Sequence, residues 1–322
     1  MRARTPMQSA VERYLDERRR LGFELRIAGH QLLQFARYAD ARGHRGPLTL
    51  DLQLNWAREH GQRSAPISCA RRLEIVRPFA AYYRQFEPQS TVPDGTPFGR
   101  AHRRLAPHIY TEQEIADLLA EAGRLAPSAG LRPTTYRTLF GLFAATGLRL
   151  SEALCLRDRD VDLSSGVLTV RQTKFKKSRC VPVHPTTVTA LRNYHGARDG
   201  AVGRDPDRPF FVSPVGRALT TQTVHRVFAQ LRTRLGWVAR GGHPRPRIHD
   251  LRHTFAVRRV QLWHQHAQRG VTIDHGMLWL STYLGHATIS DTYWYLTGVP
   301  ELLAIVGQTF ERFAGGAEGA DA

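Results

Sequence analysis

Lysine is almost absent from this chain of 322 residues. Among 46 basic residues only three are lysines, and Lys174, Lys176 and Lys177 all lie within four positions. Arginine is effectively always protonated, whereas a lysine can be tuned to release a proton. The cluster therefore suggests a site where an amine acts as an acid, in a chain that otherwise uses arginine for positive charge.

Cysteine and long apolar runs are also scarce. Cys69, Cys155 and Cys180 stand far apart without a C-x-x-C pair, which disfavours a disulfide framework or a zinc site and indicates reduced thiols. The sequence contains no apolar run of bilayer-spanning length and no recognisable secretory signal. We therefore expect a cytoplasmic protein without a membrane segment.

Basic residues outnumber acidic residues, and the excess differs between the two ends of the chain. The net charge is +18 and the pI is about 10.8, which favours a polyanion, above all a nucleic acid, as partner. Residues 1–108 hold 19 arginines against 10 acidic residues, whereas residues 271–322 hold one arginine and six acidic residues. The N-terminal third therefore suits phosphates, and the C-terminal end suits a basic protein surface.

The chain predicts two domains. Four amphipathic stretches, each of helical period, come first, at residues 9–22, 27–43, 49–61 and 68–86. Residues 87–99 then contain three prolines and two glycines, which is typical of a linker. We place a helical DNA-binding domain with its linker at 1–105 and a catalytic domain at 106–322.

The second domain mixes helices with a small sheet. Thr111 and Glu114 have the spacing of a capping box, and an apolar helical stretch follows near residues 135–146. "GVLTVRQT" and "SRCVPV" have strand composition, with the lysines at the turn between them, and helices are expected from about residue 186 to the end. The predicted fold is mainly α with a small antiparallel β-sheet.

Four short segments carry the candidate chemistry: "ATGLRLSE", the lysine turn "TKFKKSR", "IHDLRHTFA" and "LGHATISDTYWY". Together, and in this order, they resemble the tyrosine recombinases of the phage integrase family over about residues 110–300. The N-terminal helical region resembles the core-binding domain of that family in kind and position. Each motif is weak by itself, whereas the ordered set is specific.

The resemblance implies DNA cleavage by a tyrosine hydroxyl, and it assigns a role to each motif residue. Arg149 and Arg252 would hold the phosphate oxygens, because a guanidinium meets them bidentately. His286 would be a third phosphate donor and His249 would assist proton movement. Tyr295 would attack and form a 3′-phosphotyrosine.

The lysines complete this assignment. By resemblance Lys174 protonates the leaving DNA 5′-hydroxyl, which an arginine could not readily do. Lys176 and Lys177 are expected to contact backbone phosphates.

Several neighbouring residues have competing interpretations. Tyr293 and Tyr295 lie two apart, so on a helix they point about 200° apart; family spacing favours Tyr295 as the nucleophile, and Tyr293 as a packing residue. Glu152 is expected to be the structural partner of an arginine. His249 and His253 have the i, i+4 spacing of a zinc pair, but Asp250 stands where a zinc protease has glutamate, so no metal is expected.

The implied function is site-specific cutting and rejoining of DNA without a cofactor, as an integrase, a resolvase or a mobile-element transposase. A tetramer on two DNA sites and companion recombinases are expected partners. The ending "TGVPELLAIVGQTFERF" is expected to dock on a neighbouring protomer. The segment 254–285 is longer than in compact relatives. The alternative is a DNA-binding relative that has lost catalysis.

Overall fold

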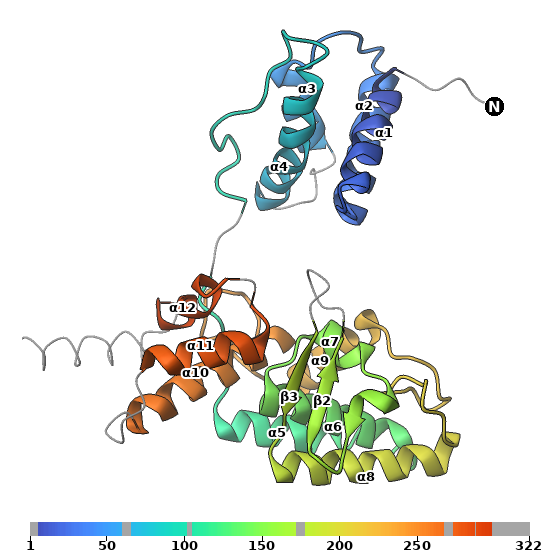
Figure 1. Ribbon diagram of the computed structural model, residues 1–322, viewed down its shortest axis with the longest axis vertical. Coiled ribbons are helices and arrows are strands. Elements are labelled where there is room, and N and C mark those ends of the chain that lie inside the picture. The colour runs from blue at the N-terminus through green and yellow to red at the C-terminus, as the bar shows by residue number, and fades with distance from the viewer. Residues whose placement is uncertain are drawn as a thin grey trace, which may run out of the picture. The chain divides into compact units, whose positions relative to one another are not determined.

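The computed structural model describes residues 6–59, 66–101, 105–171, 178–266, 273–286 and 288–297. The chain divides into two compact units, Met1–Arg104 and Leu105–Ala322. Helices dominate both units, and one small antiparallel sheet lies in the second (Figure 1). The predicted fold class, mainly α with a small antiparallel sheet, is confirmed.

The first unit consists of four helices that match the four amphipathic stretches: α1 (Pro6–Arg20), α2 (Arg26–Ala41), α3 (Leu50–Glu59) and α4 (Pro66–Tyr83). Their core is aromatic, since the ring of Phe35 meets those of Trp56 and Phe79 edge to face at 5.3 and 6.4 Å. None of the arginines on these four helices is buried. The apolar faces therefore form the core and leave the positive charge at the surface.

The second unit holds the remaining elements. They are α5 (Glu112–Ala122), α6 (Leu131–Thr146), α7 (Leu150–Cys155), the 3-10 turn η1 (Asp158–Asp160), β1 (Val161–Asp162), β2 (Val167–Val170), β3 (Arg179–Pro182), α8 (Pro185–Val202), α9 (Thr221–Arg234), α10 (Ile248–His266), α11 (Ile273–Leu284) and α12 (Ser290–Thr297). None of these described helices, and none in the first unit, is long and apolar enough to cross a membrane.

The sheet has the order β1-β2-β3 with antiparallel neighbours. Leu168 pairs with Val181, and both are buried, so this face of the sheet packs on the core. The two predicted strands are β2 and β3, and β1 is a short third strand that the sequence did not reveal. The lysine turn, residues 172–177, lies outside the described residues.

One expectation about helices was wrong. Helices were predicted from about residue 186 to the end, but residues 203–220 and 235–247 are not helical. Both segments contain two or more prolines, which remove backbone donors and stop helix propagation. The second segment leads directly into α10.

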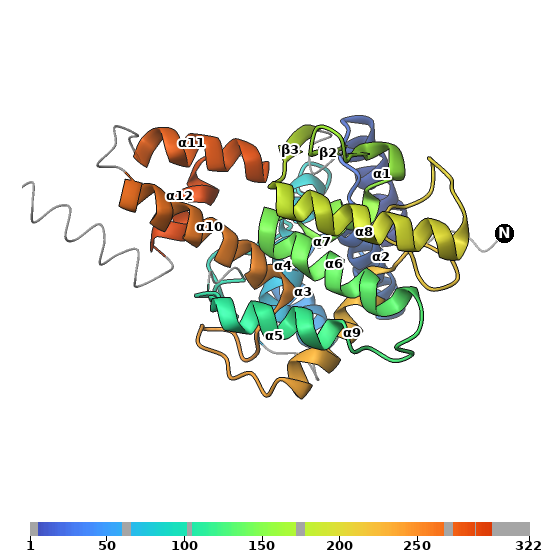
Figure 2. The same cartoon turned by 90° about the horizontal axis from the view of Figure 1, so that it is seen from below.

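Helix α10 joins two hydrophobic cores. Its Leu251 belongs to the large core built around α6, whereas its Phe255 and Val260 pack with Met277 and Leu280 of α11 in a smaller one. Figures 1 and 2 both show α10, α11 and α12 gathered at one side of the second unit, away from α8. Because α10 belongs to both cores, it fixes the α11–α12 group relative to α6.

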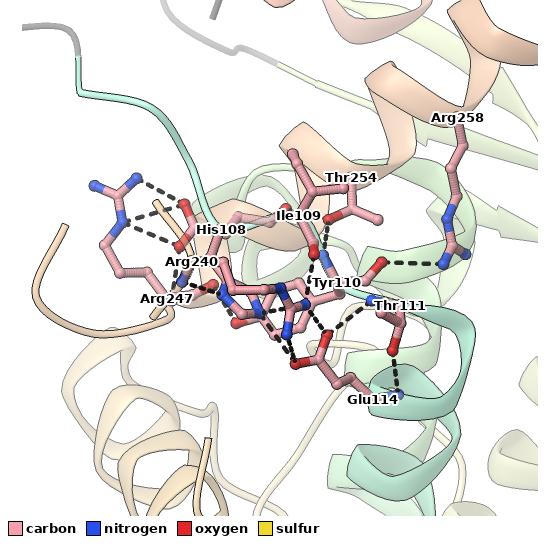
Figure 3. A network of polar contacts seen from close by, with 10 residues as sticks. His108, Ile109, Tyr110, Thr111, Glu114, Arg240, Arg247, Thr254 and Arg258 are labelled. Atoms are coloured by element: carbon pink, nitrogen blue, oxygen red, sulfur yellow. Dashed lines mark hydrogen bonds and ion pairs between the residues drawn. The ribbon is translucent and has the colours of Figure 1, made fainter. Parts of the chain in front are cut away.

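A polar network anchors the start of the second unit to α10 (Figure 3). The backbone N–H of Tyr110 donates to the buried Thr254 hydroxyl at 2.9 Å, and the Tyr110 hydroxyl donates to the Arg247 carbonyl at 3.0 Å. The predicted capping box is confirmed beside it, where Thr111 and Glu114 cap α5 reciprocally at 3.1 and 2.8 Å. Tyr110, which precedes α5, therefore contacts both the residue before α10 and the second turn of that helix.

Candidate active site

A glycine ends helix α6 just before the first predicted arginine. Gly147 has φ of 63°, the left-handed conformation that favours glycine, and its N–H closes the helix on the Phe143 carbonyl at 2.9 Å. A Cβ at this position would lie 2.8 Å from the ring of Phe255. The chain therefore turns sharply, and two residues later Arg149 precedes α7 as its N-cap.

A second glycine ends helix α11 in the same way. Gly285 has φ of 67°, its N–H donates to Thr282 at 3.1 Å, and the N–H of His286 donates to Ser281 at 3.0 Å. These two bonds form a Schellman motif, which satisfies two of the last helix carbonyls. The carbonyls of residues 283–285 have no partner within the helix and need donors from elsewhere.

Three arginines from three different elements supply those donors. Arg179 of β3 donates to the Tyr283 carbonyl at 2.8 Å, Arg252 of α10 to Leu284 at 2.8 Å, and Arg149 to Gly285 at 3.2 Å. The carboxyl end of a helix carries partial negative charge, which favours cations there. The end of α11 is therefore the point at which β3, α10 and the start of α7 meet.

Arg252 connects the two glycine turns. Its residue is only 2% exposed, and its two terminal nitrogens donate to the carbonyls of Gly147 and Leu284, each at 2.8 Å. A guanidinium can do this because its donors form a rigid fork. Arg252 therefore fixes the turn before Arg149 relative to the turn before His286.

Glu152 is a buried carboxylate held by two arginines. Its side chain is 4% exposed, and it accepts from Arg149 at 2.8 Å and from Arg179 at 3.1 and 2.8 Å. Burial by itself would raise the pKa of Glu152, but hydrogen bonds from Arg179 and from the Arg149 backbone outweigh it and hold that pKa at about 2. Glu152 is thus ionised at neutral pH and partners an arginine, as expected.

Both predicted histidines are neutral at neutral pH. Desolvation lowers the pKa of His249 and of His286 to about 4, and the charge of Arg252 adds to the effect in each case. His249 is surrounded closely enough by protein to lose hydration, yet its side chain still reaches the solvent in the first turn of α10. His286 is half-buried. The charge of Arg149 also lowers the pKa of both rings. The two histidines therefore lie in the electrostatic field of the same two arginines, Arg149 and Arg252.

Helix α12 is tied to the second turn through His286. The Nδ1 atom of His286 lies 2.6 Å from the hydroxyl of Thr292, which is fully buried. Residue 295 lies one helical turn after Thr292. The side chain of Tyr295 lies outside the described residues, as do Lys174, Lys176 and Lys177.

Tyr293 was expected to be a packing residue, but its side chain lies largely at the surface. It is 39% exposed, because α12 instead turns Thr292 and Trp294 inward. The ring of Trp294 meets that of His253 at 5.1 Å, and His253 meets His249 at 4.8 Å, both edge to face. His253 therefore packs and orients its neighbours, as predicted.

The structure brings four of the six predicted catalytic residues together: Arg149, His249, Arg252 and His286. Arg179 and Thr292 also belong to this group, and no sequence motif identifies them. Among the described residues no group of three His, Cys, Asp or Glu side chains could hold a metal ion. The three cysteines are free thiols.

Residues 109–299 match the Phage integrase family. The chain belongs to this family. Two proteins of Sinorhizobium fredii called putative integrase/recombinase, y4rB and y4rE, are 37% and 40% identical to it. The match to y4rB covers 95% of this chain and 97% of y4rB, and the match to y4rE covers 92% of this chain and 94% of y4rE. Tyrosine recombinase XerC of Xanthomonas campestris is 33% identical, over 77% of this chain and 74% of XerC.

Solved recombinase structures share the fold of this phage integrase family member. The Tn1549 transposon integrase in complex with transposon right end DNA aligns with a TM-score of 0.65 at 17% identity, over 97% of this chain and 100% of that one. XerH recombinase bound to its difH substrate aligns with a TM-score of 0.64 at 18% identity, covering 94% and 85%. These alignments establish the fold of this chain.

The ion pairs of Glu152 predict an acid-dependent loss of stability. The pKa of Glu152 is lower in the folded chain than its ordinary value of 4.5, so its contribution is complete above that value and is lost as pH falls toward about 2. We expect Glu152→Gln to cost about 3 kcal/mol at neutral pH, the scale for breaking a buried pair, and to cost progressively less below about pH 4.5.

Urea denaturation of both proteins between neutral and acidic pH measures this difference. Glu121→Gln is the matched control, because it removes an α5 carboxylate that pairs at 2.7 Å with the exposed Arg124, just beyond the end of that helix. Such a pair contributes roughly 0 to 1 kcal/mol. A Glu152→Gln cost that stayed constant with pH, or matched the control, would contradict the ion-pair account.

Proposed function

We propose that this chain cuts and rejoins DNA at specific sites through a covalent 3′-phosphotyrosine. The proposed catalytic residues are Arg149, Lys174, His249, Arg252, His286 and Tyr295. The phage integrase family is one of tyrosine recombinases, so DNA strand breakage and rejoining is the activity of this chain. The observation that supports the residue assignment is that two arginines and two neutral histidines meet at the turns that end α6 and α11.

The arginines suit the electrostatic demand of this reaction. When a tyrosine oxygen attacks a DNA phosphate, charge spreads over the phosphate oxygens, and pre-positioned donors stabilise it. Arg149 is already held by Glu152 and by the Gly285 carbonyl, and Arg252 by two carbonyls. Because both guanidinium groups are in place before DNA binds, little reorganisation accompanies the reaction.

The histidines suit proton movement and phosphate binding. A neutral His249 can accept the proton that the tyrosine hydroxyl loses, because its pKa of about 4 leaves it unprotonated at neutral pH. If the Thr292 hydroxyl donates to Nδ1 of His286, the neutral ring carries its proton on Nε2 and can donate it to a phosphate oxygen. One ring then acts as base and the other as donor.

Double-stranded DNA is the proposed substrate, and both units contact it in this proposal. Surface arginines on helices α1 to α4 supply charge for backbone phosphates, and in this proposal Lys176 and Lys177 add to it. The aligned structures include a transposon integrase and XerH, each with DNA, and a lambda integrase dimer bound to a core site. A tetramer on two sites, companion recombinases and a cytoplasmic location remain our predictions, as does the choice among integrase, resolvase and transposase.

Tyr295 is predicted to be the nucleophile. With a nicked suicide DNA that prevents rejoining, the wild-type chain should form a covalent protein–DNA adduct in the presence of EDTA. Tyr295→Phe should bind the same DNA and form no adduct, because the attacking oxygen is removed. Tyr293→Phe is the matched control, one residue from Thr292 on the exposed face of α12, and should retain cleavage.

The same assay separates the competing readings. Adducts in Tyr295→Phe but not in Tyr293→Phe would move the nucleophile to Tyr293. Specific DNA binding by wild-type chain without adduct on any cognate site would favour the catalytically inactive relative.

Lys174 is predicted to protonate the leaving 5′-oxygen. Lys174→Ala should slow adduct formation by about 10²-fold to 10⁴-fold, the range for general acid catalysis. A DNA with a bridging 5′-sulfur at the scissile phosphate should restore most of the rate, because a thiol of pKa about 8.5 leaves without a proton donor. Lys176→Ala is the control and should affect the two DNAs equally. A Lys174→Ala defect that persisted with the sulfur DNA would assign Lys174 to phosphate binding instead.

A further inference from the structure

Arg179 occupies a position that the motif pattern does not identify. It is the first residue of β3, directly after the lysine hairpin, yet its side chain is only 11% exposed. All of its described hydrogen bonds go to residues near Arg149. Nε donates to the Tyr283 carbonyl at 2.8 Å, and the two terminal nitrogens donate to the two carboxylate oxygens of Glu152 at 3.1 and 2.8 Å.

The carboxylate of Glu152 is shared between two guanidinium groups. Arg149 donates to Oε1 from its side chain at 2.8 Å and to Oε2 from its backbone at 3.0 Å, and Arg179 donates to both oxygens. In a buried site such interactions are strong because the local dielectric is low. One negative charge divided between two cations holds each of them less tightly than it would hold one. How tightly Glu152 holds Arg149 therefore depends on Arg179.

Arg179 also packs against the turn that binds Arg149. A Cβ placed on Gly285 would lie 2.7 Å from a terminal nitrogen of Arg179 and 3.0 Å from its guanidinium carbon. The Gly285 carbonyl in turn accepts from Arg149 at 3.2 Å. Arg179 thus contacts both groups that orient the Arg149 side chain, namely Glu152 and the Gly285 turn.

We infer that Arg179 is a positioning residue for DNA cleavage, which balances Glu152 and supports the Gly285 turn so that Arg149 is oriented toward the scissile phosphate. This inference rests on the proposed role of Arg149. Without Arg179, the ionised Glu152 has Arg149 as its remaining guanidinium partner and binds it more tightly than in the wild-type chain, so that Arg149 is less free to meet the phosphate. Strand β3 also loses one of its connections to the end of α11, while the Tyr283 hydroxyl still donates to the Pro182 carbonyl at 3.1 Å.

The test is a double-mutant cycle on the rate of adduct formation at saturating suicide DNA. Arg179→Gln should cleave roughly 30-fold to 100-fold more slowly, the scale for a misplaced stabilising group, while its DNA affinity changes less than about threefold, since a phosphate contact is not lost. Adding Glu152→Gln to Arg179→Gln should recover about tenfold, because the unbalanced carboxylate that competes for Arg149 is gone.

Arg171→Gln is the matched control. Arg171 follows β2 and is 57% exposed, and its partner Asp160, at 2.6 Å, is buried. Because this pair shares no described contact with Arg149 or Glu152, its loss should change the cleavage rate less than about twofold. Cleavage by Arg179→Gln at the control rate would overturn the inference. A slow Arg179→Gln that Glu152→Gln fails to recover would also overturn it, since loss of folding or of strand support is not repaired by removing a carboxylate. If Arg179→Gln does not fold, Arg179→Met, which is also uncharged, carries the same comparison with and without Glu152→Gln.

A second measurement does not depend on catalysis. The side-chain Nε–H signal of Arg149 in an NMR spectrum of the free chain should shift in Arg179→Gln, because Glu152 then no longer divides its charge between two guanidinium groups. An Arg149 signal that stayed fixed in Arg179→Gln would contradict the inference even if wild-type chain formed no adduct. Absence of wild-type adduct together with the expected shifts would instead count against the proposed function alone.

Discussion

The candidate site depends on how helix α11 ends. A Schellman turn at Gly285 satisfies two of the last carbonyls of the helix and leaves those of residues 283–285 to be satisfied from outside. Three guanidinium groups, from Arg149, Arg179 and Arg252, each bind one of them. Because these arginines come from separate elements, the end of α11 contacts strand β3, helix α10 and the motif that contains Arg149.

The two glycines of the motifs have the same physical role. Gly147 and Gly285 each end a helix in the left-handed conformation, and at each a Cβ would collide with a neighbouring side chain, Phe255 or Arg179. Arg252 binds a carbonyl in each turn and so sets their separation. Arginine suits this task because it remains charged when buried and donates in a fixed fork. Lysine is confined to residues 174–177, the place where proton release is proposed.

The sequence revealed those features whose residue types and spacing are local. The capping box, the two main strands and the four motif segments are each recognised from residues close together in the sequence. The structure confirms the capping box and the two strands. It also brings together Arg149, His249, Arg252 and His286 from the motif segments. Arg179 and Thr292 could not be found in this way. Their partners are a backbone carbonyl and a histidine ring from another segment, and a strand arginine or a helical threonine has no distinctive pattern. The exposure of Tyr293 depends on which face of α12 meets α10 and α11, which periodicity in an eight-residue helix does not fix.

The central claim is that the arginines gathered at the end of α11 receive the scissile phosphate. A structure of the chain covalently joined through Tyr295 to nicked DNA tests it most directly. The account predicts that oxygens of the phosphotyrosine accept hydrogen bonds from Arg149 and Arg252 while the carbonyls of residues 283–285 keep their arginine donors. A phosphotyrosine that lies beyond hydrogen-bonding distance of both arginines, or that requires the Gly285 turn to open, would contradict it.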